Sequence, residues 1–200
     1  MYSQNNEEQI IINYFKDFKG HLLDIGANDG VTLSNSRKLI ELGWSADLVE
    51  PAPIPFKQLE ELYKENNKVK LHNCAISDFT GLTSFYVSGE HLGNGDTDLL
   101  STLSLKDKQK WESTTEYKTI EVQALTFKDF NTLNTKYDFI NIDVEGLDVQ
   151  VLKQLDLNEL ECKCLCIEHN GTHLNAINEE MSKYNFKVIG QNLENIIYAK

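Results

Sequence analysis

Short apolar runs alternate with amphipathic stretches along almost the whole chain, and this alternation limits the fold more than any other feature. Apolar runs of about 4 to 8 residues are typical of buried strands, and apolar residues at helical spacing are typical of helices packed on a sheet. Repeated strand and helix units form a largely parallel sheet with helices on both faces. The expected strands cover residues 21–25, 44–49, 69–75, 137–142, 163–167, 186–189 and 196–198. The expected helices cover residues 7–18, within an N-terminal stretch 5–18, and residues 32–42, 56–65, 126–133, 148–155 and 175–184.

The last two expected strands are close enough in sequence to form an antiparallel hairpin. The predicted α/β fold is therefore a mostly parallel seven-stranded sheet that ends in this hairpin. Two additional strands, 82–87 and 119–124, flank the polar segment 88–118, which contains several glycines and a short helix near Trp111. Polar segments of this kind often cover binding sites, so we predict a lid or insertion here. No linker or repeat divides the chain, and residues 1–200 are predicted to form one domain.

The charge balance of the chain limits its partners. The 200 residues include 31 acidic and 19 basic side chains, the formal net charge is −12, and Arg37 is the only arginine. Because binding of a polyanion needs clustered basic residues, we expect neither nucleic acid nor an anionic membrane as a partner. No apolar run approaches the about 18 residues of a membrane helix, and no leader pattern opens the chain. We expect a cytoplasmic protein and leave its oligomeric state open, with a homodimer as one option.

The cysteines are interpreted as buried reduced thiols. Cys162, Cys164 and Cys166 alternate, which would place them on one face of a strand, and Cys74 stands alone. Zinc sites favour other spacings, and disulfide frameworks belong to small secreted chains.

The segment LLDIGANDG, residues 22–30, carries the sharpest functional signal. A buried strand ends in a carboxylate and turns through two glycines into the next element, and ligands of open α/β sheets bind at such strand ends. Gly26 and Gly30 allow a close approach of the backbone to a ligand. The segment is not a dinucleotide fingerprint, because Asn28 and Val31 stand where glycines are needed. The plain alternative is a tight turn with a capping side chain.

Two acidic residues indicate the kind of ligand. Asp24 would repel a pyrophosphate, but it suits a ligand with an ammonium and a sulfonium group, such as S-adenosylmethionine. Glu50 ends the second strand and is placed to accept hydrogen bonds from both ribose hydroxyls, and we favour this role over the alternative of an exposed strand-end carboxylate. The end of the third strand would offer adenine the backbone of Ala75 and Ile76 and the side chain of Asp78. The predicted cofactor-binding residues are Asp24, Gly26, Asn28, Gly30, Glu50, Ala75, Ile76, Asp78 and Asp143.

The chain resembles the FkbM-type S-adenosylmethionine-dependent methyltransferases. The matching segments are DIGANDG at 24–30, Glu50-Pro51, NCAISDFTG at 73–81, VQALTFKDF at 122–130 and FINIDVEG at 139–146. The sequence departs from the family at Asn141, where lysine is usual, and at Asp148, where glutamate is usual. The resemblance implies a class I methyltransferase fold, which is Rossmann-like. It also implies methyl transfer to a hydroxyl of a sugar, a glycan precursor or a secondary metabolite.

Potential acid, base and metal-binding groups gather at the ends of the fourth and fifth strands of the sheet. The predicted catalytic residues are Asp143, Glu145, Glu168 and His169, with Asn170 beside them. His169 has the most suitable ordinary pKa for a general base, and Glu145 would orient it or the acceptor. The second option is Mg²⁺ or Mn²⁺ held by Asp143, Glu168 and Asn170. We rank the base ahead of the metal and assign no metal ligand.

The leading functional hypothesis is an O-methyltransferase that acts on a small molecule or a saccharide. The alternative is a non-catalytic S-adenosylmethionine-binding protein with a regulatory role or a role as a partner subunit. A nicotinamide-dependent oxidoreductase is disfavoured, because the dinucleotide fingerprint is missing.

Overall fold

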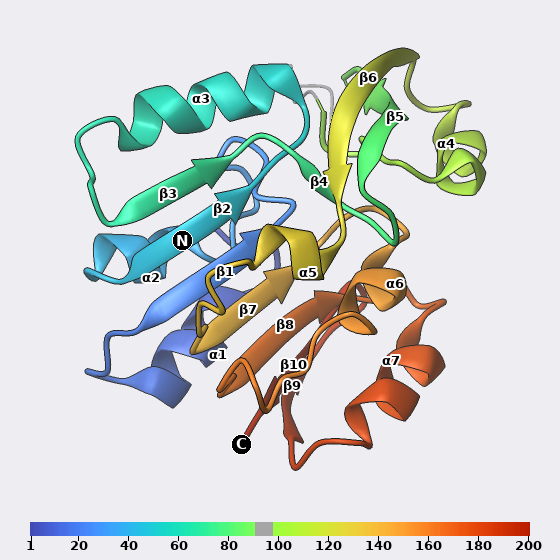
Figure 1. The fold of residues 1–200 in the computed structure, drawn as a ribbon. Helices are drawn as coiled ribbons and strands as arrows, with labels where there is room; N and C mark the ends of the chain where they lie inside the picture. Colours follow the sequence, from blue (N-terminus) through green and yellow to red (C-terminus); the bar gives the residue numbers. More distant parts are fainter. Residues whose placement is uncertain (91–97) are drawn as a thin grey trace.

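The computed structural model describes residues 1–90 and 98–200, which form an α/β fold around a seven-stranded sheet (Figure 1). The strands of this sheet are β1 (His21–Ile25), β2 (Ser45–Val49), β3 (Val69–His72), β7 (Phe139–Ile142), β8 (Cys164–Glu168), β9 (Lys187–Gln191) and β10 (Asn195–Ala199). Their order is β3-β2-β1-β7-β8-β10-β9. All neighbouring pairs are parallel except those of β10, which runs antiparallel to both β8 and β9. The predicted parallel sheet with a closing hairpin is confirmed.

Helices pack on both faces of this sheet, as predicted (Figure 1). They are α1 (Glu7–Phe15), α2 (Arg37–Glu41), α3 (Pro53–Tyr63), α5 (Phe127–Phe130), α6 (Asp148–Leu152) and α7 (Leu174–Met181). The first three pack with Leu22 of β1 in one apolar cluster, and the last three pack with Leu23 in the other. Because both faces are covered, the central strands β1, β2, β7 and β8 are buried at nearly every position.

A second, three-stranded sheet departs from the prediction of a third strand at 69–75. Its strands are β4 (Ala75–Ile76), β5 (Gly81–Ser88) and β6 (Tyr117–Leu125), in the order β4-β6-β5. Pairing of β3 with β2 ends at His72. The side-chain Nδ2 of Asn73 then donates to the backbone oxygen of Glu50 at 2.9 Å. The chain leaves the main sheet there and pairs with β6 instead. The additional strands predicted at 82–87 and 119–124 both belong to this sheet.

The predicted helix over 32–42 is wrong in its first half. The side chain of Asp29 accepts hydrogen bonds from the backbone N–H groups of Val31 and Thr32, both at 2.7 Å, which favours a turn over a helix. The helix begins only at Arg37, and residues 32–36 form a loop.

Other helix boundaries also differ from the predictions. The N-terminal helix ends at Phe15 rather than at residue 18, because Lys16 adopts a φ of 53°. Helix α3 begins earlier than predicted, at Pro53, where the fixed φ of proline suits a first turn. Helix α5 ends at Phe130.

All four cysteines are buried free thiols, as predicted. The prediction of a shared face holds for Cys164 and Cys166, which pack in the cluster of α1 to α3. It is wrong for Cys162, which precedes β8 and packs in the opposite cluster.

The predicted lid at 88–118 is described only in part. His91, Gly93 and Gly95 lie outside the described residues. The described part contains a helix near Trp111 as predicted, α4 (Leu105–Trp111). Across residues 1–90 and 98–200, no helix has the length and apolar character needed to span a membrane.

Candidate active site

A cavity of about 310 Å³ opens at the carboxyl ends of β1, β2, β7 and β8. Asp24, Val49, Asp143 and Glu168 line it from the ends of these strands. This is the edge at which open α/β sheets bind ligands. The volume lies at the lower end of the usual range for small-molecule sites, roughly 300 to 1,000 Å³.

Asp24 is held in this cavity by neutral donors. Its oxygens accept hydrogen bonds from the Ser36 hydroxyl and, at 2.8 Å, from Nδ2 of Asn141. The Oδ1 atom of Asn141 in turn accepts from Nδ2 of Asn35 at 3.1 Å. Burial raises the pKa of Asp24, and the two hydrogen bonds offset part of this effect. Asn141 therefore orients Asp24 but leaves its negative charge in place. A lysine at this position would neutralise that charge.

The two glycines of the first loop have different roles. Gly26 has a φ of 92°, and a Cβ there would overlap the carbonyl oxygen of Asp143, so glycine allows the loop to close against the end of β7. Gly30 has a φ of 74° but packs against Leu59 of α3 and does not line the cavity. The structure therefore shows Gly30 in packing contact with α3, and its contact with the cofactor remains a prediction. Asn28, by contrast, lines the cavity.

Glu50 joins the first loop to the end of β2. Its Oε2 accepts from the backbone N–H of Asn28 at 2.9 Å, and its Oε1 accepts from that of Ala52 at 2.7 Å. Burial raises the pKa of Glu50 to about 7. Each carboxylate oxygen can accept a second hydrogen bond, so Glu50 can both fix the loop and bind a ribose hydroxyl. The ribose contact remains a prediction.

The predicted adenine contacts are separated by the structure. Ala75 and Ile76 line the cavity from β4. Asp78 is exposed, does not line the cavity, and accepts a 3.4 Å hydrogen bond from the Ser77 hydroxyl. The structure gives no support to adenine binding by Asp78, because the chain turns away from the cavity after β4.

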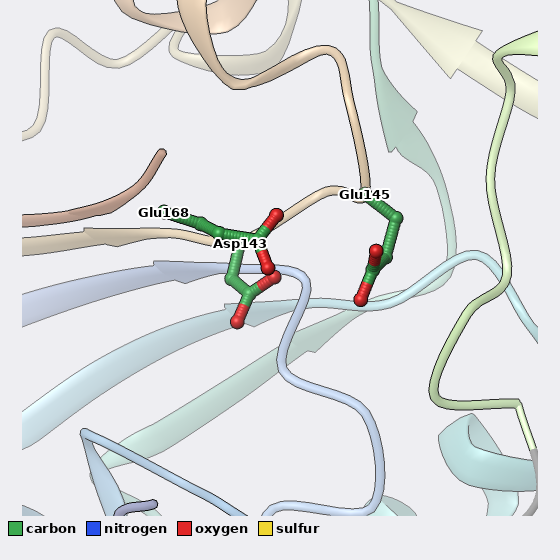
Figure 2. A group of neighbouring side chains, drawn as sticks. All are labelled: Asp143, Glu145 and Glu168. Carbon is green, nitrogen blue, oxygen red and sulfur yellow. The ribbon is translucent and has the colours of Figure 1, made fainter. Parts of the chain in front are cut away.

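Asp143, Glu145 and Glu168 form a cluster that we call the carboxylate trio. One oxygen from each lies within 4.8 Å of the others, and Figure 2 shows Asp143 and Glu168 side by side with Glu145 on the following loop. Asp143 follows β7, and Glu168 ends β8, so the parallel pairing of these strands brings the two together. Glu145 has a φ of 52°, an uncommon value for a residue with a side chain.

The trio holds its protons more tightly than isolated carboxyls do. Burial, followed by repulsion from Asp148 and Asp24, raises the pKa of Asp143 to about 8. Burial and the charge of Asp143 raise the pKa values of Glu145 and Glu168 well above their ordinary values. Perturbations of this size in a cavity are typical of functional sites.

Asp148 shapes the loop that carries Glu145. Its two oxygens accept hydrogen bonds from the backbone N–H groups of Val144 at 3.0 Å and Gly146 at 3.1 Å. Burial raises its pKa to about 6, and these hydrogen bonds oppose that increase. Asp148 therefore acts on the site by positioning its neighbours.

His169 does not fit the predicted role of general base. Its Nδ1 accepts from the backbone N–H of Gly171 at 2.9 Å, and its Nε2 lies 3.2 Å from the carbonyl oxygen of Asn192, to which it must donate. Both ring nitrogens are thus occupied, and the buried ring does not line the cavity. Its neighbour Asn170 does line it.

The segment after the undescribed residues lies against the trio. The Thr102 hydroxyl donates to the backbone oxygen of Glu145 at 2.7 Å, and Asp107 packs so closely on Gly146 that a Cβ there would overlap it. Leu100 and Trp111 line the cavity from the same segment. The cavity wall therefore includes residues of the predicted lid.

Several lining residues are absent from the sequence-based predictions. They include Gln4, Asn35, Phe85, Glu194 and Asn195. Asn35 belongs to the loop at 32–36, for which the sequence predicts a helix. Its polar neighbours Ser34 and Ser36 favour a loop and could have indicated this part of the site. The others come from segments distant in sequence, for which no local pattern exists.

The charged side chains of the cavity lining in the described residues are all acidic. Its ionisable oxygen groups are Asp24, Glu50, Asp98, Asp143, Glu145, Glu168 and Glu194. No Lys, Arg or His lines the cavity in the described part of the chain. This arrangement favours cationic or neutral ligands.

A family model described as the methyltransferase FkbM domain matches residues 24–188. This chain belongs to the FkbM methyltransferase family. The match extends from Asp24 through the trio into β9, so it includes the carboxyl ends of β1, β2, β7 and β8 that line the cavity. No curated protein matches the sequence of this FkbM methyltransferase.

Solved structures that resemble this FkbM methyltransferase share its fold. A ribosomal protein L11 methylase from Lactobacillus delbrueckii subsp. bulgaricus is 13% identical with a TM-score of 0.52, over 97% of this chain and 76% of that one. A putative RNA methyltransferase from Pyrococcus horikoshii is 14% identical with a TM-score of 0.53, over 98% and 82%. A precorrin-6y C5,15-methyltransferase from Geobacter metallireducens GS-15 is 11% identical with a TM-score of 0.51, over 96% and 87%. At these identities the likeness shows the Rossmann-like methyltransferase fold alone.

S-adenosylmethionine is the expected cofactor of an FkbM methyltransferase, and the cavity fits it. The buried Oδ1 of Asn35 lines the cavity and has no hydrogen-bond partner, so an acceptor is available for a donor on the ligand. The carboxylates of Asp24 and Glu50 line the same cavity and are acceptors that could bind the ammonium and ribose groups of this cofactor. The cavity of this FkbM methyltransferase therefore offers several hydrogen-bond acceptors to its cofactor.

Proposed function

We propose that this methyltransferase methylates a hydroxyl group of a sugar, a glycan precursor or a secondary metabolite. The observation that carries the proposal is the carboxylate trio, which lies beside the cofactor loop and has raised pKa values. The acidic lining disfavours acceptors with a phosphate or carboxylate inside the cavity, and this favours a neutral hydroxyl compound.

The chain would contribute alignment and a proton acceptor. When bound, S-adenosylmethionine supplies an electrophilic methyl group on a sulfonium. Asp24 and Glu50 would orient the cofactor, while Leu100 and Trp111 would contact the apolar part of the acceptor and exclude water. Alignment of this kind accounts for a large share of the rate in methyl transfer.

The hydroxyl proton must leave as the carbon–oxygen bond forms. A carboxylate of the trio is the natural hydrogen-bond acceptor for this hydroxyl, and the pKa of about 8 at Asp143 makes it a stronger base than an ordinary aspartate. The trio therefore replaces His169, whose ring nitrogens are occupied by backbone groups.

A transfer assay with labelled S-adenosylmethionine tests this proposal. Neutral glycosides, amino sugars, nucleotide sugars and polyketide alcohols would be compared, and NMR of the product would locate the methyl group. We expect an O-methyl product, at least 100-fold slower turnover in Asp143→Asn, and unchanged turnover in the exposed control Glu121→Gln. Methylation on nitrogen would overturn the O-methyl assignment. Tight cofactor binding without transfer to any acceptor would favour the non-catalytic alternative.

A further inference from the structure

No basic side chain among the described residues lines the cavity around the carboxylate trio. One carboxylate oxygen of each member lies within 4.8 Å of the others; Asp143 and Glu145 follow β7, and Glu168 ends β8. Like charges at this separation cannot all ionise unless a cation joins them. The positive charge of Lys110 on α4 opposes the increase in the pKa of Glu145, but Lys110 does not line the cavity.

A second observation indicates a ligand at this place. Asn195 of β10 is opposite Glu168 in the antiparallel register, so both side chains leave the sheet on the same face. Asn195 is 5% exposed and lines the same cavity. Its Nδ2 donates to Oε1 of Glu7 at 2.9 Å, whereas its buried Oδ1 has no hydrogen-bond partner among the described residues. A buried amide oxygen without a hydrogen-bond partner costs free energy, and a ligand that binds this oxygen offsets the cost.

These groups form an all-oxygen ligand set. Carboxylate and amide oxygens are the preferred ligands of Mg²⁺, Mn²⁺ and Ca²⁺, whereas the set contains no imidazole or thiolate that would favour zinc. Metal–oxygen distances of about 2.0 to 2.6 Å bring ligand atoms on opposite sides of an ion to roughly 4 to 5 Å from each other. The spacing of the trio is compatible with one ion among its members.

We propose that Asp143, Glu145 and Glu168, with the Oδ1 atom of Asn195, bind one divalent cation that prefers oxygen ligands. The cation joins the two central strands to the Glu145 loop and leaves coordination positions open to the cavity. Its catalytic role rests on the proposed function: an acceptor oxygen bound to it would lose its proton more readily. The cation site itself does not depend on the identity of the acceptor.

Electron paramagnetic resonance of Mn²⁺ tests the site directly. The full chain is freed of metal with EDTA, exchanged into chelator-free buffer at pH 8, and titrated with Mn²⁺ alone, because the free ion gives a signal that decreases on binding. We expect one Mn²⁺ per chain, competition by Mg²⁺, and at least tenfold weaker binding in Glu168→Gln and Glu145→Gln. Glu121→Gln, an exposed carboxylate on β6, is the matched control and should bind as the parent does. Circular dichroism and binding of S-adenosylhomocysteine show that each variant is folded.

Two outcomes would overturn the inference. One is the absence of Mn²⁺ binding at 1:1 stoichiometry by a folded chain that binds S-adenosylhomocysteine. The other is unchanged Mn²⁺ affinity in both trio variants. If alkylammonium ions occupy the site and Mn²⁺ does not, the trio binds an amine-bearing acceptor instead of a metal.

The experiments distinguish a failure of the proposed cation site from a failure of the proposed function. Stoichiometric Mn²⁺ binding together with N-methyl products would retain the cation and reject the O-methyl assignment. O-methyl transfer that continues at full rate in EDTA would retain the proposed function and reject a catalytic cation.

Discussion

At the scale of single residues, the carboxylates of this protein divide into groups that fix loops and groups left for ligands. Glu50 and Asp148 each accept two backbone hydrogen bonds, so they hold the first loop and the loop of Glu145. Among the described residues, Asp24 accepts hydrogen bonds from neutral groups, and no cationic side chain lines the cavity beside the trio. The site therefore combines rigid loops with unneutralised charge.

Replacement of Glu50 tests its predicted contact with ribose. Loss of hydrogen bonds to a charged acceptor costs about 1.5 to 3 kcal/mol, so Glu50→Ala should bind S-adenosylhomocysteine roughly 10- to 150-fold more weakly. Because Glu50 also fixes the loop, the sharper readout is the preference for 5′-methylthioadenosine over its 2′-deoxy analogue. Calorimetry should show this preference in the parent and its loss in Glu50→Ala. A preference that survives in the variant would exclude the ribose contact.

The raised carboxyl pKa values predict a pH dependence of cofactor binding. Glu50 and Asp143 lose their protons between about pH 6 and 9. Because a cationic ligand binds the ionised carboxylates more tightly, the affinity for S-adenosylmethionine should increase with pH over this range. Calorimetry in two buffers of different ionisation enthalpy would measure the protons released. Binding without proton release at pH 7 would contradict the assignment.

The same groups make stability depend on pH in the opposite direction. The folded chain retains protons on Glu50 and Asp143 that the unfolded chain loses near pH 4, so the free energy of unfolding should decrease as pH increases toward 8. In Asp143→Asn, the free energy of unfolding should decrease less between pH 5.5 and pH 8 than in the parent. Urea titrations at these two pH values would measure the difference.

At the scale of elements, the neighbouring strands β1, β2 and β3 are joined by a polar cluster. Asp47 of β2 is buried, and its oxygens lie 2.6 Å from Nε2 of His21 and 2.7 Å from Nε2 of His72. Burial alone would raise the pKa of Asp47, but the hydrogen bonds of the two histidines outweigh it and lower the pKa below its ordinary value. The cluster lies away from the cavity lining and stabilises the sheet.

Asp47→Asn should lower the free energy of unfolding by about 1.5 to 3 kcal/mol at pH 7, since it removes hydrogen bonds to a charged group. A carboxyl with a lowered pKa stabilises the fold above its unfolded pKa and loses that effect as pH falls. The difference between Asp47→Asn and the parent should therefore shrink below about pH 4. Urea unfolding at pH 7 and pH 3 measures this difference, with Asp78→Asn as the exposed control. An equal difference at both pH values would argue against the ionised cluster.

The described part of the predicted lid, residues 98–118, forms much of one cavity wall. Its contacts to the Glu145 loop through Thr102 and Asp107 suggest that ligand binding and the position of this segment are coupled. Limited proteolysis should cleave between residues 88 and 118 first, and S-adenosylhomocysteine should slow this cleavage severalfold. Thr102→Val should increase the cleavage rate without ligand. Cleavage at equal rates with and without ligand would mean that the segment is a fixed wall.

At the scale of the whole molecule, the acidic charge of this protein bears on its predicted lack of a nucleic-acid partner. The net charge is −12, and the cavity lining is acidic as well. Polyanions are repelled from such a surface at low and moderate salt.

We therefore expect no binding of RNA or duplex DNA up to roughly 100 µM at physiological salt, the weak end of nonspecific affinities. Fluorescence anisotropy with labelled oligonucleotides measures this directly. Saturable binding that weakens with salt would show that the net charge is a poor guide to the partner.

The sequence by itself determined the sheet and the location of the site. Apolar runs in LLDIG and FINID bury both faces of their strands, and each run ends in a carboxylate at the edge where ligands bind. These are local patterns, so Asp24, Glu50 and Asp143 were identifiable from neighbouring residues alone.

Only the tertiary structure decided which of these residues share an environment. The pairing of β10 with β8 places Asn195 opposite Glu168, and the departure of the chain after His72 removes Asp78 from the cavity. The hydrogen bonds that occupy both nitrogens of His169 come from backbone groups, one of them 23 residues away. No periodicity encodes such contacts, because they depend on how separate elements meet in space. The pKa values follow from the same cause, since burial and repulsion in the trio exist only once β7 and β8 have paired.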